Sequence, residues 1–549
     1  MKNIIFVSDF FYEEIPGGAE AATHNLSEML FSDQPNVFKV KIKSEHINAA
    51  FVENHKDCFF IVSNFVLLSP EAMTAIKNCD YVIYEHDHKY LRTRDPSPFK
   101  DYLAPSAILC NVDFYKKAKA VVCQSQKHAD ILKSNLLLGN VINAGCSLWK
   151  PEELDYLQEL LDNQSKTKKT GIMKSDNWVK GTQKAVDYCQ VKKIEHELIP
   201  PMKYKDFMTE LSSFERVVFF SQVFETFCRF LVEARVLNCE IVTNDSNGCT
   251  SEKWVVENKG QELLNEIKSR QSVVVKMFED VVLGDYQKHL EPLNAPKVSI
   301  LTSVYKGDEY IEHFMEDITS QTYFDNCELI LVNCNSPGNE DSVIEKYMNQ
   351  YPDNIKYVKL DEDPGVYGAW NKAIEMSTGE YVTNANLDDR RSTFHIEQSV
   401  KHLINNNDVD LIYGPTLMTE AKNETFENNS SNGSIYPVFE FSPENMVKCL
   451  PGCMPVWRKS MHDKSGLFDE NLKYAGDWDM WLRAVKDGSK FLKIDEILGL
   501  YYFNPEGLST NSEKENERFK EEKEIFWSNK ETFGQANFDQ FKEYFSREV

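Results

Sequence analysis

The sequence predicts an α/β protein with several domains. Its 549 residues exceed one ordinary domain, and at roughly 150 residues per domain three or four compact units are expected. Short apolar strands alternate with amphipathic stretches, which is typical of α/β layering. The hydrophobic fraction of 42% and the charged fraction of 27% are those of globular proteins, so disorder, collagen and coiled coil are excluded for the chain as a whole.

The first part of the chain is predicted to form two α/β lobes, residues 1–165 and 166–290. Their strands are expected, in chain order, at 4–8, 58–63, 81–84, 120–124, 170–173, 216–220 and 240–243. Helices are expected at 152–163 and 257–286, with a polar, basic linker at 164–169. Two prolines forbid a continuous helix through 292–296, so we place a hinge there.

The second part is predicted to form one larger α/β domain, residues 296–511, followed by a helical tail, 512–549. Its main strands and helices are expected, in chain order, at 297–305, 309–321, 328–332, from 365 onwards and at 380–383. Residues 422–434 are rich in Asn, Ser and Glu, which indicates an exposed loop. Aromatic residues at helix-like intervals in the tail predict one or two docking helices.

Charge and cysteine usage restrict the partners and the compartment. The net charge of −25 repels nucleic acid and anionic membranes, which argues against both as partners. No apolar run reaches the ~18 residues of a membrane span, and the first residues lack the features of a signal peptide. The 13 cysteines are scattered without a C-x-x-C pair. We therefore expect reduced thiols and a cytoplasmic location.

Short polar side chains follow three expected strands of the second part, where ligands of open α/β sheets bind. The candidate donor-binding residues are Thr302, Tyr305, Asn333, Asn371, Asn386, Asp388 and Asp389. Adjacent carboxylates favour Mg²⁺ or Mn²⁺, which bridges a carboxylate to a substrate diphosphate. The alternative is that Asp388 and Asp389 only cap the next helix.

A second acidic group opens a predicted helix at 476–483. Asp477 is a candidate for the base that removes a proton from an acceptor hydroxyl, and Asp479 is the reserve candidate. The two carboxylates are two residues apart, so they cannot both face a substrate from a regular helix. The interleaved Trp478 and Trp481 either stack on a sugar or fill the core.

In this order, the motifs between residues 298 and 483 resemble glycosyltransferase family 2, which has the inverting GT-A fold. The resemblance implies a nucleotide-sugar donor, a UDP- or GDP-sugar, and a Mn²⁺ or Mg²⁺ ion at Asp388 with Asn386. It also implies that Asp477 is the catalytic base. Asn386 stands where the family has an aspartate, and Asn333 and Cys334 stand where it has paired aspartates.

The first part carries a different set of candidates. Glycines before a helix let backbone N–H groups approach phosphate, lysines after a strand can pair with a diphosphate, and two glutamates eight residues apart can hold sugar hydroxyls. The candidates are Gly17, Gly18, His86, Lys174, Lys180, Glu225, Thr226, Phe227 and Glu233. Taken alone, the glycines also fit a tight turn and the glutamates a helix cap, whereas the His86 segment favours a polar acceptor cleft over a metal site or a solvated loop.

Their order resembles glycosyltransferase family 4, the retaining, metal-independent GT-B fold. The resemblance implies that Lys180 contacts the donor diphosphate, Glu233 the ribose and Glu225 the transferred sugar, with no metal. Thr226, Cys228 and Arg229 stand where the family has small glycines.

We therefore expect an N-terminal GT-B-like pair of Rossmann-type lobes followed by a C-terminal GT-A nucleotide-sugar-binding domain. The expected function is a two-domain glycosyltransferase acting on a glycan acceptor. One alternative is a single active GT-A transferase whose N-terminal half binds glycan without catalysis. Another is glycosylation of a modified DNA base, against which the negative charge argues.

Overall fold

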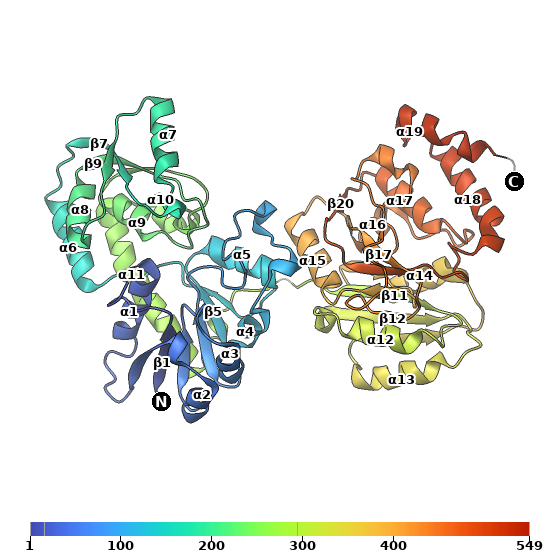
Figure 1. Ribbon diagram of the computed structural model, residues 1–549, viewed down its shortest axis with the longest axis horizontal. Helices are drawn as coiled ribbons and strands as arrows, with labels where there is room; N and C mark the ends of the chain where they lie inside the picture. Colours follow the sequence, from blue (N-terminus) through green and yellow to red (C-terminus); the bar gives the residue numbers. More distant parts are fainter. Residues whose placement is uncertain (1, 16, 294, 548–549) are drawn as a thin grey trace. The chain divides into compact units, whose positions relative to one another are not determined.

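The computed structural model describes residues 2–15, 17–293 and 295–547, and it divides into two compact units, Met1–Leu293 and Asn294–Val549 (Figure 1). Both units combine helices with parallel strands, which confirms the predicted α/β class. Pro16 of the glycine loop and Asn294 of the expected hinge lie outside the described residues. Across the described ranges, we find no helix with the length and apolar character that a bilayer crossing requires.

The first unit contains a larger lobe built on a parallel sheet in the order β2-β1-β3-β4-β5-β6. The strands are β1 (Ile4–Ser8), β2 (Lys39–Lys43), β3 (Phe59–Val62), β4 (Asp80–Tyr84), β5 (Ala120–Cys123) and β6 (Val141–Asn143). Its helices are α1 (Gly18–Met29), α2 (Ala49–Asn54), α3 (Pro70–Ile76), α4 (Val112–Lys117) and α5 (Gln126–Leu136). The central strands are buried on both faces, which explains their continuous apolar runs.

A smaller lobe follows, with a parallel sheet in the order β10-β9-β7-β8. Its strands are β7 (Lys168–Met173), β8 (Glu197–Ile199), β9 (Phe214–Phe219) and β10 (Glu240–Thr243), and its helices are α7 (Thr182–Lys192), α8 (Tyr204–Ser212), α9 (Arg229–Val236) and α10 (Lys253–Glu257). The linker expected at 164–169 is wrong in its last two residues. Lys168 and Lys169 open β7, because Lys168 pairs in register with Phe214 and its ammonium contacts Glu197 and Glu210.

Helices α6 (Pro151–Asp162) and α11 (Gly260–Leu283) join the two lobes through one core. Phe278 of α11 packs edge-on against Tyr84 of β4, with ring centroids 4.9 Å apart. The two lobes therefore share buried surface.

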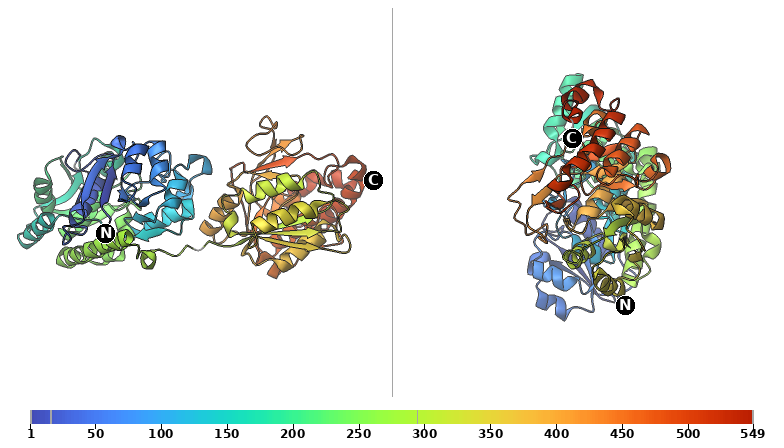
Figure 2. Two further views of the ribbon diagram at one scale, coloured as in Figure 1. Left: turned by 90° about the horizontal axis from the view of Figure 1, so that it is seen from below. Right: turned by 90° about the vertical axis from the view of Figure 1, so that its right-hand side faces the viewer.

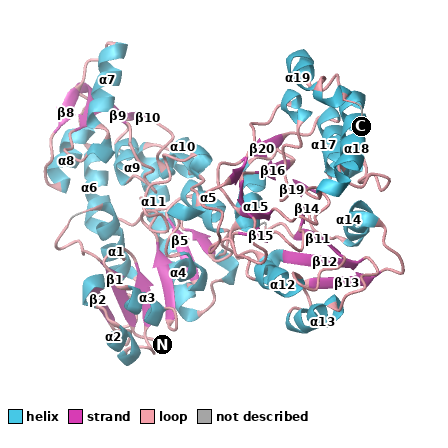
Figure 3. Cartoon of the chain, turned by 45° about the vertical axis from the view of Figure 1, so that its right-hand side comes forward, coloured by secondary structure: helices cyan, strands magenta, loops and turns pink. Residues whose placement is uncertain are grey.

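The second unit is built on a mixed sheet in the order β13-β12-β11-β14-β19-β16-β20 (Figure 3). These strands are β11 (Val298–Val304), β12 (Cys327–Asn333), β13 (Ile355–Lys359), β14 (Tyr381–Asn384), β16 (Leu411–Tyr413), β19 (Val456–Arg458) and β20 (Phe491–Lys493). A second sheet contains β15 (Arg390–Arg391), β17 (Thr416–Thr419), β18 (Ile435–Tyr436) and β21 (Gly499–Tyr502). The helices are α12 (Ile311–Thr319), α13 (Glu340–Gln350), α14 (Gly365–Met376), α15 (His395–Asn405), α16 (Met461–Ser465) and α17 (Gly476–Lys486). Residues 422–434 form the expected loop.

The tail forms two helices, α18 (Glu515–Ser528) and α19 (Gly534–Phe541), as expected (Figure 2). Phe526 of α18 stacks on Phe545, and Trp478 of α17 stacks on Phe533. Trp478 and Trp481 are 5% and 1% exposed. The two tryptophans therefore fill the core shared by α17 and the tail, and the sugar-stacking interpretation is wrong.

Candidate active site

An acidic loop follows β14 at the carboxyl edge of the parallel strands of the second unit. Since β12, β11 and β14 are hydrogen-bonded neighbours, the segments after them share one edge of the sheet. Asp389 is buried and accepts hydrogen bonds from Asn386 Nδ2 at 3.0 Å and from the Tyr502 amide at 3.2 Å. Asp388 is half-buried, and its Oδ2 accepts a hydrogen bond from Asn504 Nδ2 at 2.9 Å.

The two neighbouring carboxyls have different electrostatic environments. Burial, together with the charge of Asp388, raises the pKa of Asp389 to about 7. The loop thus presents carboxylate and amide oxygens, which hard divalent cations prefer. Within the described residues, no three His, Cys, Asp or Glu side chains come together as a potential metal cluster.

Asp477 is the second residue of α17, and its carboxylate is held from three sides. Oδ1 accepts hydrogen bonds from the Trp478 amide at 2.9 Å and from Tyr367 OH at 3.3 Å. Cys449 Sγ lies 3.7 Å from Oδ2. Burial raises the pKa of the Asp477 carboxyl, which makes it a stronger base.

Asp479 is in a different environment. Its Oδ2 lies 2.8 Å from Arg483 Nε on the next turn of the same helix. This ion pair engages the carboxylate, whereas Asp477 contacts only neutral donors among the described residues.

Two neighbouring tyrosines respond to the charges of the acidic loop and of Asp477. The rings of Tyr436 and Tyr501 have centroids 6.1 Å apart. Burial, together with the charges of Asp389 and Asp388, raises the pKa of Tyr501 to about 12. Burial and the charge of Asp477 contribute to the raised pKa of Tyr436. The charges of the two acidic groups thus reach adjacent tyrosine rings.

The other residues proposed for donor binding in this unit lie in separate places. Thr302 is fully buried in β11, and its Oγ1 has no hydrogen-bond partner among the described residues. Asn333 donates to Asp341 of α13, and Asn371 donates to the Phe468 carbonyl. Tyr305 is 43% exposed.

Sequence reasoning missed three side chains that contact the proposed aspartates: Tyr367, Cys449 and Asn504. The only signal was that Tyr367 lies inside a glycine-flanked stretch that opens α14.

Comparison with known proteins gives this site a family. Residues 299–464 match the family model described as Glycosyl transferase family 2. The second unit carries a glycosyltransferase family 2 domain. The match ends at residue 464, so Asp477 and the tail lie beyond it.

Similar proteins are named as glycosyltransferases or as proteins of teichoic or teichuronic acid biosynthesis. The uncharacterized glycosyltransferase RT0329 of Rickettsia typhi is 30% identical over 224 residues, which cover 39% of this chain and 63% of that protein. The minor teichoic acid biosynthesis protein GgaB of Bacillus subtilis is 27% identical over 38% of this chain and 23% of that protein. The putative teichuronic acid biosynthesis glycosyltransferase TuaG of Bacillus subtilis is 24% identical over 40% of this chain and 84% of that protein.

Solved structures are similar at low identity. S. aureus TarS residues 1–349 in complex with UDP-GlcNAc is 19% identical, with a TM-score of 0.36, over 45% of this chain and 71% of that one. The mannosyltransferase PcManGT from Pyrobaculum calidifontis, in complex with GDP-Man and Mn²⁺, is 16% identical, with a TM-score of 0.34, over 44% of this chain and 65% of that one.

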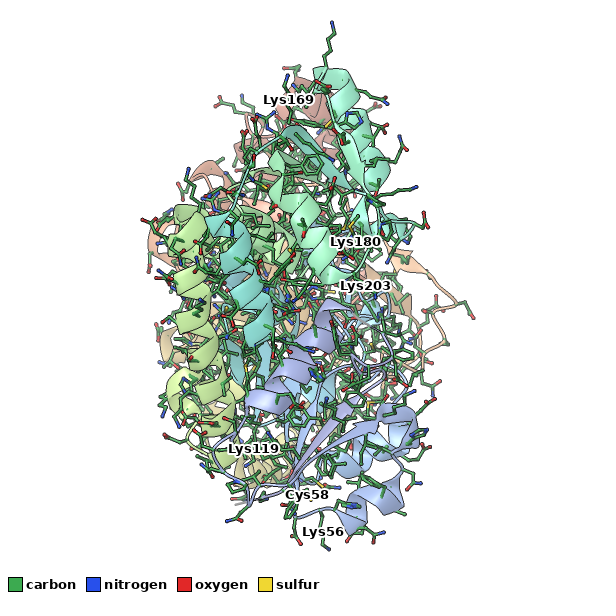
Figure 4. The ribbon with its side chains drawn as sticks, turned by 90° about the vertical axis from the view of Figure 1, so that its left-hand side faces the viewer. Lys56, Cys58, Lys119, Lys169, Lys180 and Lys203 are labelled. Carbon is green, nitrogen blue, oxygen red and sulfur yellow. The ribbon has the colours of Figure 1, made fainter. Side chains whose placement is uncertain are left out.

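The candidates of the first unit lie outside the glycosyltransferase family 2 domain, and the fold brings several of them together. Lys180 Nζ lies 2.5 Å from Glu225 Oε1, and Figure 4 labels Lys180 beside the start of α7. Thr226 Oγ1 donates to the His86 carbonyl at 2.8 Å, which links the smaller lobe to the larger one. Burial lowers the pKa of His86 to about 3, so its ring is neutral.

Four further candidates of this unit are not brought together with them. Gly17 and Gly18 begin α1, and Lys174 is exposed after β7. Phe227 is 1% exposed and packs against Trp149.

Three side chains contact one carboxylate oxygen of Glu233. It is buried, and its Oε1 accepts hydrogen bonds from Trp149 Nε1 at 2.9 Å and from Tyr204 OH at 3.2 Å. Arg229 Nη2 lies 3.3 Å from the same oxygen and 2.8 Å from Glu153 Oε2. Protein groups thus already engage one oxygen of the carboxylate that the family 4 resemblance assigns to ribose.

Proposed function

We propose that the second unit is an inverting, metal-dependent glycosyltransferase that moves a sugar from a UDP- or GDP-sugar to a hydroxyl group of a glycan. The observation that carries this proposal is the geometry of Asp477, a half-buried carboxylate with a raised pKa that Tyr367 orients and that has no cationic partner among the described residues. The family 2 match supports the reaction class. The similarity to GgaB and TuaG favours an acceptor of the teichoic or teichuronic acid type.

In this mechanism Asp477 takes the proton of the acceptor hydroxyl. The acceptor oxygen forms a bond to the anomeric carbon, while the bond from that carbon to the diphosphate oxygen breaks. The nucleoside diphosphate leaves with the bonding electrons, and the configuration at the anomeric carbon inverts. Tyr367 OH orients the base through its bond to Oδ1.

Asp388 and Asn386 would hold a Mn²⁺ or Mg²⁺ ion. The fit rests on their oxygen donors and on the repulsion between the two neighbouring carboxyls, which is visible in the raised pKa of Asp389. Such ions need only one or two protein carboxylates, since substrate phosphates and water complete the shell. When bound, the ion neutralises charge on the leaving diphosphate.

The test compares Asp477→Asn with Asp479→Asn in the full-length chain, with transfer measured from UDP- and GDP-sugars. A general base contributes about 10²–10⁴-fold, so Asp477→Asn is expected to lower kcat by that factor. Asp479→Asn is expected to stay within about tenfold, because its carboxylate already pairs with Arg483. The reverse order would assign the base to Asp479.

For the first unit, we propose binding of the acceptor glycan without sugar transfer. The observation that favours this role is Glu233, whose carboxylate is occupied by Arg229, Trp149 and Tyr204. Under this proposal Glu225→Gln leaves every transfer reaction intact, and Asp477→Asn slows all of them by the same factor. A transfer reaction that survives Asp477→Asn and is lost in Glu225→Gln would show a second catalytic centre in the first unit.

A further inference from the structure

A carboxylate of the tail accepts hydrogen bonds from the backbone segment that leads into α17. Glu521 of α18 accepts three backbone hydrogen bonds. They come from the Lys473 amide to Oε2 at 2.8 Å, and from the Tyr474 and Ala475 amides to Oε1 at 2.7 and 2.6 Å. Tyr474 is fixed a second time, because its OH donates to Glu517 Oε2 at 2.7 Å. The tail thus determines where the chain stands just before Asp477.

The start of α17 depends on this contact. Its N-cap residue is Ala475, whose side chain has no hydrogen-bond acceptor. Glu521 supplies a carboxylate from a distant helix, and negative charge near a helix N-terminus is favourable. Hydrogen bonds to an ionised acceptor are roughly twice as strong as neutral ones.

The helix that carries Glu521 is itself held firmly. Phe519 and Phe526 of α18 are buried with Phe545, and Trp478 packs against both Phe533 and Phe545. Asp477, which accepts the hydrogen bond from Tyr367, lies between Ala475 and Trp478 in the sequence. The aromatic core therefore fixes α17 on one side of Asp477, and Glu521 fixes the chain on the other side.

We propose that Glu521 is a positioning residue for Asp477, which makes the tail a working part of the catalytic centre. This proposal rests on the assignment of Asp477 as the base. The family 2 match covers residues 299–464, so this role belongs to a segment outside that match. Misplacement of a reacting group by about 1 Å costs on the order of 10²-fold in rate. The hydrogen bonds from the segment before Asp477 to Glu521 are therefore expected to affect kcat.

Graded variants separate positioning from folding. Glu521→Gln keeps one carbonyl oxygen for Tyr474 and Ala475 and loses the acceptor for Lys473, whereas Glu521→Ala loses all three bonds. We expect kcat to fall about tenfold in the first variant and about 10²-fold in the second, with the donor KM within twofold of wild type.

The matched control is Glu524→Gln on the same helix. Glu524 is exposed and accepts no hydrogen bond from the part of the chain described by the structure, so wild-type kinetics are expected. The double variant Asp477→Asn/Glu521→Gln should be no slower than Asp477→Asn, since Glu521 acts through Asp477.

Three results would overturn the proposal: unchanged kcat in folded Glu521→Gln, a loss that appears only in the donor KM, or an additive loss in the double variant. Circular dichroism confirms that each variant is folded. If Asp477→Asn keeps the kcat of the wild type, the proposed base is wrong, and this failure is distinct from a failure of the positioning role of Glu521.

Discussion

Asp477 and Asp479 lie two residues apart on one helix, yet their carboxylates have different partners. Asp479 faces Arg483 on its own helix, whereas Asp477 faces Tyr367 from another element. The sequence predicts that only one of the two can face a substrate, because a helix turns about 200° over two residues. It does not predict which one, since Tyr367 is brought there by the tertiary fold alone.

Gly476 provides a test at the residue scale. A Cβ at this position would lie 2.7 Å from the Tyr367 ring, closer than real side chains approach. Gly476→Ala is therefore expected to displace the ring that holds Asp477, with a loss of about 1–3 kcal/mol in unfolding free energy and a fall in kcat of about 10²-fold. Urea unfolding and steady-state kinetics measure the two effects.

Gly18→Ala is the control for this substitution. No heavy atom lies within 4 Å of a Cβ at Gly18, the first residue of α1. Its unfolding curve should match that of the wild type. Wild-type kinetics in Gly476→Ala would contradict the proposed link between Tyr367 and the base.

Among the elements, the strands were predicted best where they are apolar. Strands β1 and β10 have the expected bounds, and in β1 the reason is complete burial, which leaves an unbroken apolar run. Strand β2 was missed, since its sequence alternates lysine with apolar residues and it lies at the sheet edge. Strands β6 and β8 were missed because three residues are too short for a periodic signal.

Strand β12 carries an internal charge that joins several elements. Glu328 is fully buried, and its carboxylate contacts Lys297 at 3.0 Å, Lys356 at 2.8 Å and Ser299 at 2.7 Å. It also accepts hydrogen bonds from the Thr378 hydroxyl and the Gly379 amide before β14. These bonds lower the pKa of the Glu328 carboxyl well below its ordinary value. One side chain thus ties β11, β12, β13 and β14 together.

Glu328→Ala is expected to lower the unfolding free energy of the second unit by about 1–3 kcal/mol, since the buried Ser299 hydroxyl and the Thr378 hydroxyl lose their charged acceptor. The lowered pKa means that this stabilisation is present above the ordinary glutamate pKa and is lost as the pH falls below it. Glu312→Ala is the control, because its pair with Lys346 is exposed and worth less than about 1 kcal/mol. Equal losses in the two variants would contradict the role of Glu328.

For the molecule as a whole, acid is expected to act more strongly on the first unit. Burial lowers the pKa of His86 to about 3 and of His88 to about 4, and that of His128 well below its ordinary value. The unfolded chain binds these protons first, so stability present above pH 6.5 is lost as the pH falls toward 4. Each histidine contributes about 1.4 kcal/mol per pH unit in this window.

Scanning calorimetry at pH 7.5 and pH 5.5 measures this effect. The transition of the first unit should move down further than that of the second, where one fully buried histidine, His395, has a comparable shift. His128→Gln should reduce the movement, whereas His46→Gln should not, because His46 is exposed. Equal movement of both transitions would contradict this prediction.

Most of the chemistry in the candidate site could be anticipated as residue types, but its geometry could not. The acidic residues after β14 and at the start of α17 were found by their positions at element ends. Their partners Tyr367, Asn504 and Glu521 come from segments remote in sequence, where no spacing rule applies. The proposed roles of these residues await the tests above.

The ion pair of Arg229 and Glu233 has a consequence for engineering the first unit. Both side chains belong to α9, four residues apart, so the pair persists however the two lobes move. Opening the lobes cannot expose the carboxylate, whereas exchanging one side chain can. Arg229→Ala leaves Glu233 with two neutral donors, Trp149 and Tyr204. Arg229→Ala is thus the starting point for making this carboxylate available to a ribose ligand.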